Sequence, residues 1–239
     1  MNEFSRVQFG SAGAANLDFT CGDIRASRFF RSVKTTRLSF YETHGKRALD
    51  LTVTLLVAPI LIVLVGVFAL AVWFQGGAPI YTQKRVGRGG RIFTIYKIRS
   101  MVRDADARLE AHLAADPKAR REWNVHQKLK QDPRITGLGH FIRKTSIDEL
   151  PQFLNVLTGD MSLIGPRPFM EDQRALYKGT AYYVMRPGLS GSWQVSERSE
   201  SSFEERRTYD DQYFRDVSLG TDMRIFGKTF GVLANASGV

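Results

Sequence analysis

Cysteine and histidine are scarce in this chain of 239 residues. Its single cysteine, Cys21, excludes an intramolecular disulfide framework and a zinc site built from cysteines. The histidines lie far apart, at His44, His112, His126 and His140. Because none of them shows the HxxxH or HxH spacing of metal-binding pairs, we expect no transition-metal site built from histidine. The sequence also has no Walker motif, no GxGxxG fingerprint and no internal repeat, which excludes the common phosphate-binding loops and the repeat architectures.

Lys and Arg outnumber Asp and Glu on both sides of an apolar run at residues 51–74, and the segment after the run has no acidic residue. The composition, 43% hydrophobic and 24% charged, is that of a globular protein, and the length suits one domain. Residues 1–48 carry eight Lys and Arg against four acids, residues 84–103 carry seven against none, and residues 104–239 carry nineteen of each sign. The net charge of +10 therefore flanks the apolar run. This distribution suits an anionic membrane surface better than nucleic acid, and a membrane-tethered nucleic-acid binder is suggested only by the pI of 9.9.

The apolar run itself, residues 51–74, contains no charged residue. As a helix it would reach about 36 Å, against a hydrocarbon core of about 30 Å. A buried core helix is a poor alternative because no polar face recurs through the run. A signal peptide is also a poor alternative, because the run begins far from the N-terminus and has no cleavage pattern. The sequence therefore predicts insertion into a membrane.

Pro59 and the two basic flanks leave the topology of this segment open. A proline inside a helix removes one hydrogen bond, at a cost of about 3 kcal/mol. The positive-inside rule cannot place both flanks in the cytoplasm if the segment crosses once. A helix broken at Ala58–Pro59 that enters and leaves by the same face satisfies both observations, whereas a kinked single-pass helix is the alternative.

The segments around the apolar run give weaker signals. Residues 1–43 read as a basic arm that is disordered rather than a lipid-facing basic stripe. Residues 92–101 are rich in β-branched and aromatic side chains and predict a strand, on which Lys97 and Arg99 would share a side.

Residues 104–130 predict a helix that is interrupted at Asp116–Pro117. Its apolar anchors are expected to be Leu109, Leu113 and Trp123. Such helices either lie along the membrane interface or pack on the domain.

The densest motif, TSIDELPQFLNVLTGDMSLIGPRP, occupies residues 145–168. A helix is expected from Thr145 or Ser146 to a C-terminal cap at Gly159. Asp148 and Glu149 then lie in its first turn, where a capping box formed by Ser146 and Glu149 is a purely structural alternative.

The neighbouring residues favour a catalytic role for the two acids over a role in capping the helix. Arg167 is held between two prolines, and Asp160, Arg143, Lys144 and Arg186 lie close in the sequence. Carboxylates among fixed cations are what Mg²⁺-assisted phosphoryl chemistry requires, because the oxygens bind the metal and the guanidinium groups bind phosphate.

Taken in order, these segments resemble the bacterial sugar transferases, or monotopic phosphoglycosyl transferases, over roughly residues 44–235. The matching segments are KRALDL at 46–51, the Pro-broken run, YTQKRVG at 81–87, FTIYKIRSM at 93–101, the SIDELPQFLNVLTGDMSLIGPRP block, RPGLSG at 186–191, and a tail from Tyr209-Asp210 to Asp222. The short form with one membrane segment, which starts exopolysaccharide assembly, is the most similar form of the family.

The resemblance implies a covalent, two-step reaction. In this family Asp148 would attack the sugar-linked phosphate of a UDP-sugar and expel UMP, and undecaprenyl phosphate would then take the phosphosugar. Glu149 would ligate Mg²⁺. The implied phosphate or nucleotide ligands are Lys97, Arg99, Arg143, Arg167 and Arg186, with Asp160 and Asp222 orienting the basic residues. The sugar is expected to be a hexose, galactose or glucose.

The resemblance also implies an α+β, monotopic membrane protein of the bacterial inner membrane. Its expected parts are an arm at 1–43, a re-entrant helix-break-helix at 44–83 with the break at Pro59, and a cytoplasmic catalytic domain of helices and short strands at 84–239, with interfacial amphipathic helices. Its partners would be the UDP-sugar, undecaprenyl phosphate and membrane lipids. The alternative is a membrane-attached adaptor of polysaccharide assembly that has the fold but no turnover.

Overall fold

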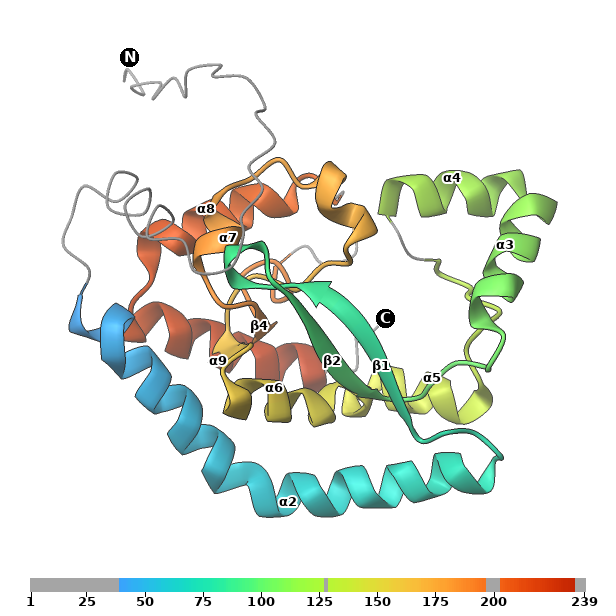
Figure 1. Cartoon of the computed structure of the whole chain (residues 1–239), viewed down its shortest axis with the longest axis horizontal. Coiled ribbons are helices and arrows are strands. Elements are labelled where there is room, and N and C mark those ends of the chain that lie inside the picture. The colour runs from blue at the N-terminus through green and yellow to red at the C-terminus, as the bar shows by residue number, and fades with distance from the viewer. Residues whose placement is uncertain (1–38, 127–128, 197–202, 235–239) are drawn as a thin grey trace.

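One long helix lies against a small domain of helices and short strands (Figure 1). The structure is a computed structural model, and it describes residues 39–126, 129–196 and 203–234. The prediction for the basic arm falls almost entirely outside these residues.

The long helix consists of a π-helical turn, η1 (Tyr41–Gly45), followed by α2 (Lys46–Phe74). Figure 1 shows α2 bent near its middle, and Pro59 lies inside the helix there. The predicted break is therefore a bend, because α2 continues through the proline as one helix. The helical segment begins at Tyr41 and the following strand begins at Ile80. The expected domain boundaries at residues 44 and 83 stay a prediction.

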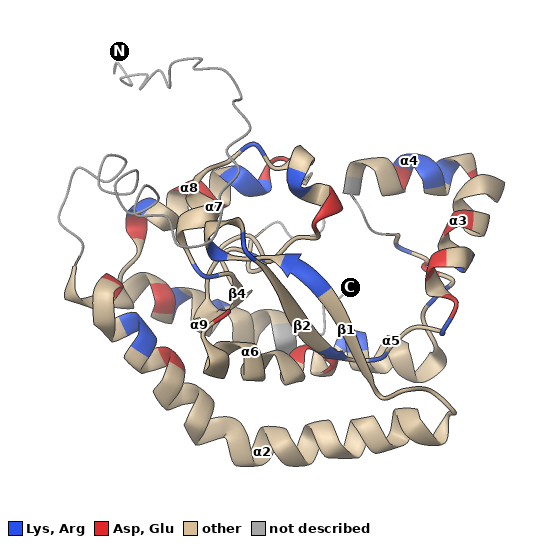
Figure 2. Cartoon of the chain, viewed as in Figure 1, with Lys and Arg blue, Asp and Glu red and all other residues tan. Residues whose placement is uncertain are grey.

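The side chains of α2 are largely exposed and apolar. Leu56 and Ile62 are 73% and 72% exposed, and Figure 2 shows no charged residue in α2 beyond its first turns. Within the described parts of the chain, Tyr41–Phe74 is the one helical segment long and apolar enough to cross a membrane. This agrees with the predicted insertion.

A β-hairpin follows. Strand β1 (Ile80–Val86) pairs antiparallel with β2 (Ile92–Ile98), from Ile80 opposite Ile98 to Val86 opposite Ile92. The turn between them, η2 (Arg88–Gly90), contains a left-handed residue at Gly89, where φ is 69°. The predicted strand is confirmed, although it ends at Ile98, so that Arg99 does not share a strand face with Lys97.

The interrupted helix is also confirmed. Helix α3 (Ala105–Ala115) ends before Asp116, and α4 (Pro117–His126) starts with the proline, whose missing N–H costs nothing at a first helical position. The expected anchors pack together, with Leu109 and Leu113 buried and Trp123 partly buried against them.

The rest of the domain surrounds the hairpin. Its elements are α5 (Gly137–Lys144), η3 (Ile147–Gln152), α6 (Phe153–Thr158), β3 (Ser162–Ile164), η4 (Asp172–Leu176), α7 (Ala181–Val184), β4 (Gly188–Ser190), α8 (Arg206–Asp216) and α9 (Leu219–Ala234). Strands β3 and β4 pair in parallel. The largest core cluster joins β2, α6, β3, α8 and α9 through Ile95, Val156, Met161, Leu163, Ile164, Tyr213 and Ile225. The predicted mixture of helices and short strands is confirmed.

Candidate active site

Asp148 and Glu149 lie in the 3₁₀ turn η3 rather than in the first turn of an α-helix. Ser146, just before it, has a left-handed backbone with φ of 56°, and its side chain makes no capping hydrogen bond. The capping-box interpretation is therefore wrong. Pro151 gives a physical reason, because it lacks an N–H and disfavours α-helical geometry at the preceding residue. The predicted cap at Gly159 is confirmed, with φ of 91°.

The two carboxylates share one lysine. Lys97 Nζ on β2 lies 2.8 Å from Glu149 Oε1 and 3.6 Å from Asp148 Oδ2. Arg167 Nη2 lies 3.1 Å from the same oxygen of Glu149. Asp148 is buried, with 7% of its surface exposed, whereas the Glu149 side chain is 21% exposed. The two neighbouring acids thus occupy different environments, as a division of chemical roles requires.

The protonation of Asp148 is set by opposing effects. Burial raises its pKa, the Lys97 ammonium lowers it, and the Glu149 carboxylate raises it again. More distant cations, Arg143 and Arg167, also lower it. The net effect is a raised pKa, and Lys97 is the main group that opposes protonation of this buried carboxylate.

Two arginines that could not be predicted from the sequence, the buried Arg206 and the half-buried Arg85, lie near Arg167. Arg206 Nη2 donates to the Arg167 carbonyl oxygen at 2.6 Å, and the Arg206 side chain is 5% exposed. Its guanidinium also stacks on the rings of Trp193 and Phe203, at 4.8 and 4.9 Å from the ring centroids. These contacts hold the guanidinium in one place.

The second arginine, Arg85 on β1, donates hydrogen bonds to the Pro168 carbonyl oxygen at 3.4 Å and to Gln83 Oε1 at 2.6 Å. Burial lowers its pKa to about 10, helped by the positive charges of Arg167 and Arg206, while Glu149 raises it. The Nε atoms of Arg85 and Arg206 are buried without a hydrogen-bond partner. A cluster of three guanidinium groups with unused donors is a site for phosphate oxygens. This cluster could not be predicted from the spacing of residues in the sequence, because Arg85 and Arg206 are far apart in the chain and come together only on folding.

Other predicted site residues lie elsewhere. Arg99 follows the end of β2, and its Cδ lies near Gly77. Arg186 and Asp160 line a pocket of about 140 Å³ at the opposite end of the hairpin, together with Arg88 and Arg91. Their predicted role as substrate ligands stays a prediction.

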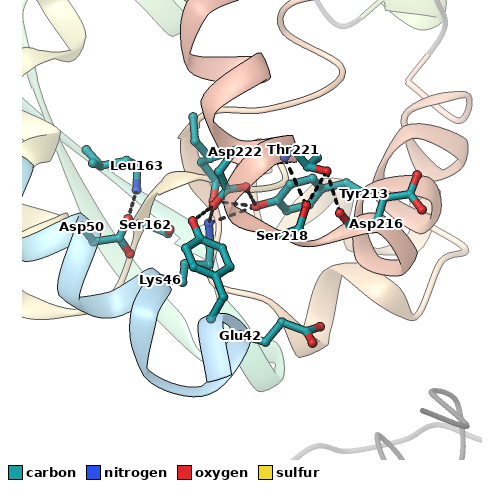
Figure 3. A network of polar contacts seen from close by, with 12 residues as sticks. Glu42, Lys46, Asp50, Ser162, Leu163, Tyr213, Asp216, Ser218, Thr221 and Asp222 are labelled. Atoms are coloured by element: carbon teal, nitrogen blue, oxygen red, sulfur yellow. Dashed lines mark hydrogen bonds and ion pairs between the residues drawn. The ribbon is translucent and has the colours of Figure 1, made fainter. Parts of the chain in front are cut away.

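Asp222 lies in a buried network at the start of the membrane helix (Figure 3). Its carboxylate accepts hydrogen bonds from the hydroxyls of Tyr41 and Tyr213, each at 2.6 Å, and pairs with Lys46 Nζ at 2.6 Å. The same helix carries Asp50, which accepts from the Ser162 hydroxyl and the Leu163 N–H, each at 3.0 Å. The structure therefore places Asp222 where it fastens α9 to the start of α2.

The acidic pair has the chemistry of a magnesium site. The described residues contain no cluster of three or more His, Cys, Asp or Glu side chains. Mg²⁺ ordinarily needs only one or two carboxylates, with substrate phosphates and waters completing its shell. Asp148 and Glu149 therefore fit Mg²⁺ when a phosphorylated substrate is present.

Comparison with known proteins identifies the family. The family model described as bacterial sugar transferase matches residues 41–236, so the chain belongs to this family, as its sequence predicts.

Two of the relatives bear the names of transferases, and a third is named for exopolysaccharide production. The chain is 47% identical over 195 residues to the UDP-galactose-lipid carrier transferase of Erwinia amylovora, and 42% identical over 199 residues to the undecaprenyl-phosphate galactose phosphotransferase of Salmonella typhimurium. Each alignment covers 81% of this chain but only 41% of the relative. The exopolysaccharide production protein ExoY of Rhizobium meliloti is 36% identical over 219 residues, which cover 89% of this chain and 96% of ExoY.

Proposed function

We propose that the chain transfers a sugar 1-phosphate from a UDP-sugar to undecaprenyl phosphate, as the first membrane step of exopolysaccharide synthesis. The names of the relatives support the reaction class, since they include an undecaprenyl-phosphate galactose phosphotransferase and a UDP-glucose:undecaprenyl-phosphate glucose-1-phosphate transferase. The same names favour galactose or glucose as the sugar.

The observation that carries the proposal is the buried carboxylate of Asp148 beside Lys97 and Glu149, with Arg167 paired to Glu149. Burial makes the ionised carboxylate a stronger nucleophile because it is poorly solvated, and the lysine opposes its protonation. The arginines supply donors for the diphosphate of the donor substrate.

The proposed reaction has two displacements at the same phosphorus. An Asp148 oxygen bonds to the sugar-bearing phosphorus of the UDP-sugar, the bond from that phosphorus to the bridging oxygen breaks, and UMP leaves with the bond electrons. A phosphate oxygen of undecaprenyl phosphate then attacks the phosphorus and the Asp148 carboxylate leaves, which yields undecaprenyl diphosphate sugar. Arg167 and Arg206 would hold the charged oxygens in both steps.

Magnesium completes the proposed site. Glu149 is the residue that would hold it beside the nucleophile, and the ion would neutralise the negative charge of the diphosphate. Lys97 and Arg167 already balance the charge of Glu149, so this side chain remains in place before the metal arrives.

The contacts of α2 support a re-entrant topology. Near its first residues, Arg47 donates to the carbonyl oxygens of Val156 and Leu157, and Lys46 pairs with Asp222. At its other end, Val72 packs in one buried cluster with Ile98 and Ile142. Both ends of the helix therefore contact the same domain, which a single straight crossing of the bilayer would prevent.

Apolar side chains on the neighbouring elements support a monotopic location. Phe141 on α5 is 52% exposed and stacks on Phe68 of α2, with ring centroids 6.1 Å apart. Leu154 and Leu157 on α6, which packs against α2, are 50% and 43% exposed. These side chains suit the interface of the cytoplasmic leaflet of the inner membrane, where a water-soluble donor can meet a lipid acceptor.

The test is UMP release from a panel of UDP-sugars, with Mg²⁺ and undecaprenyl phosphate, by the full chain in detergent. We expect release from one hexose donor, and a loss of at least about 10³-fold in Asp148→Asn. Asp106→Asn on α3, which removes an exposed carboxylate far along the chain from the site, is the matched control and should keep wild-type activity. A wild-type chain that releases no UMP from any donor would favour the adaptor instead.

A second measurement tests the covalent step. Labelled UMP should exchange into the UDP-sugar in the absence of undecaprenyl phosphate, because the first displacement is complete without the acceptor. If UMP is released only when the acceptor is present, and no labelled UMP exchanges into the UDP-sugar without it, the reaction would be a single displacement instead.

A further inference from the structure

A second cationic site lies at the end of the hairpin opposite Lys97. The pocket of about 140 Å³ there is lined by Gly87, Arg88, Arg91, Ile92, Phe93, Gly159, Asp160 and Arg186. Asp160 is the one acid in this lining, and its Oδ2 accepts a hydrogen bond from the Thr158 hydroxyl at 3.1 Å. Within the described part of the chain, no ion pair is formed by the three lining arginines, Arg88, Arg91 and Arg186.

The arginines are held together despite their like charges. Arg186 Nε donates to the Gly159 carbonyl oxygen at 3.0 Å, which fixes its guanidinium at the pocket wall. Burial lowers the pKa of Arg186, and the nearby charges of Arg88, Arg47 and Arg91 lower it further. A cluster of guanidinium groups of this kind is relieved by an anion, and it matches the geometry of phosphate oxygens.

This pocket lies far from Asp148, the proposed nucleophile. Between Asp148 and Gly159 the backbone advances roughly 18 Å along η3 and α6. Between Lys97 and Phe93 it advances roughly 14 Å along β2. Because reacting atoms must approach to about 3 Å, a phosphate in this pocket is not the one that Asp148 attacks. The volume is also smaller than the pockets of about 300 Å³ or more that hold drug-sized ligands, so the pocket itself encloses a group of phosphate size rather than a whole nucleotide sugar.

The pocket lies close to the start of α2, where the apolar part of this helix begins. Arg47 Nη2 donates to the Leu157 carbonyl oxygen at 3.1 Å, next to Gly159 at the pocket wall. The uncharged run of α2 begins four residues after Arg47, and Leu55 is already 59% exposed. If α2 is inserted in the bilayer, Gly159 therefore lies near the level of the lipid headgroups.

From this charge, size and position we propose that Arg88, Arg91 and Arg186 bind the phosphate of an anionic phospholipid headgroup. This inference depends on the insertion of α2, which is part of the proposed function, but it does not depend on the transfer reaction. The bound headgroup would hold the hairpin turn at the bilayer surface, at the side of the domain opposite the acidic pair.

The test measures which lipid the full chain retains. The chain is reconstituted in vesicles of phosphatidylcholine with a minor fraction of phosphatidylglycerol and extracted in mild detergent, and the retained lipids are quantified by mass spectrometry. We expect enrichment of phosphatidylglycerol in the wild type, and about tenfold less in the variant Arg88→Gln/Arg91→Gln. Both side chains are exposed, so the variant should fold, and its UMP release shows whether the active site is intact.

The matched control, Arg120→Gln/Arg121→Gln, removes the same charge from α4 and should retain lipid as the wild type does. An equal loss in both variants, or no loss in Arg88→Gln/Arg91→Gln, would overturn the proposal. In a separate arm, inorganic phosphate is added to the chain in detergent and thermal unfolding is recorded. Stabilisation by phosphate without enrichment of phosphatidylglycerol would assign the pocket to a water-soluble phosphate and also overturn the lipid assignment.

Discussion

Lys97 Nζ lies 2.8 Å from Glu149 Oε1, and the same ammonium lies 3.6 Å from Asp148 Oδ2. The lysine reaches the acids from β2, while both acids lie on η3, so the packing of the hairpin against the 3₁₀ turn creates this contact. One side chain therefore couples the fold of the hairpin to the ionisation of the proposed nucleophile.

Replacing Lys97 should change the pH dependence of the reaction. In Lys97→Gln the pKa of Asp148 rises, because burial and Glu149 then act without the strongest opposing charge. An ionised carboxylate is needed for attack, so the acidic limb of the pH–rate profile for UMP release should move to higher pH. The control is Lys84→Gln on β1, which removes an exposed lysine from the same hairpin. A superimposable profile for Lys97→Gln would show that Lys97 does not set the ionisation of Asp148.

Asp222 should be important for stability. Asp222→Asn removes a buried charge that faces Lys46 and two tyrosine hydroxyls, and the lysine is left without its partner. We expect the free energy of unfolding to fall by about 3 kcal/mol. The matched control, Asp216→Asn, changes an exposed carboxylate at the end of α8, shortly before Asp222 in the chain, and should have an effect within about 0.5 kcal/mol. Denaturant unfolding of the full chain in detergent measures the free energy of unfolding of both variants. Equal values for the two variants would show that Asp222 does not stabilise the fold.

Because of the titration of Asp210, the free energy of unfolding should fall as the pH rises. Burial raises its pKa to about 7, against the opposing effects of Arg206 and the hydrogen bond from Tyr177. Between the ordinary carboxyl pKa of about 4 and pH 7, the unfolded chain releases this proton while the folded chain keeps it. Stability from this group is therefore complete below about pH 4 and is lost as the pH rises to 7, at no more than about 1.4 kcal/mol per pH unit.

Asp210→Asn should flatten the unfolding free energy over this interval, because the amide does not titrate. Asp216→Asn is the control, since Asp216 is an exposed acid at the end of the same helix, α8. Thermal unfolding of the full chain at pH 4, 5, 6 and 7 reports the slope. If Asp210→Asn keeps the wild-type slope, Asp210 is ionised in the folded chain throughout.

Local features of the structure could be predicted from the sequence. The uncharged run, the interruption at Asp116–Pro117 and the cap at Gly159 depend on neighbouring residues, so periodicity and backbone chemistry were sufficient. The acidic pair was found because its two carboxylates are adjacent. The left-handed backbone of Ser146 was missed, since the capping pattern around it is a valid local alternative to the 3₁₀ turn.

Long-range contacts could not be predicted in this way. Lys46 and Asp222 are 176 residues apart, and Arg206 and Arg167 are 39 apart. Each pair is made by packing of whole elements, and no spacing rule relates their positions. For the same reason the sequence grouped Arg186 and Asp160 with the acidic pair, whereas the fold places them at the other end of the hairpin.

The bend at Pro59 should decide on which side of the membrane α2 begins. With the bend, the first residues of α2 reach the domain, as the pair of Lys46 and Asp222 requires, so we expect both ends of the helix to lie on the same side of the membrane. A cysteine at Thr43, which is exposed, and one at Lys118 on α4 should therefore react with a membrane-impermeant maleimide from the same side. Both probes are placed in a chain in which Cys21 is replaced by serine, and labelling is compared in intact cells and in inverted membrane vesicles.

Pro59→Ala restores a backbone hydrogen bond and removes the cause of the bend. We expect a straighter helix, a fraction of chains whose Thr43→Cys probe reacts from the opposite side, and weaker folding, because Lys46 can no longer reach Asp222. Val63→Ala, an exposed position of the same helix, leaves the backbone unchanged and should keep both probes on one side. If the two probes react from opposite sides already in the chain that keeps Pro59, α2 crosses the membrane once, and the re-entrant topology is wrong although the reaction could still stand.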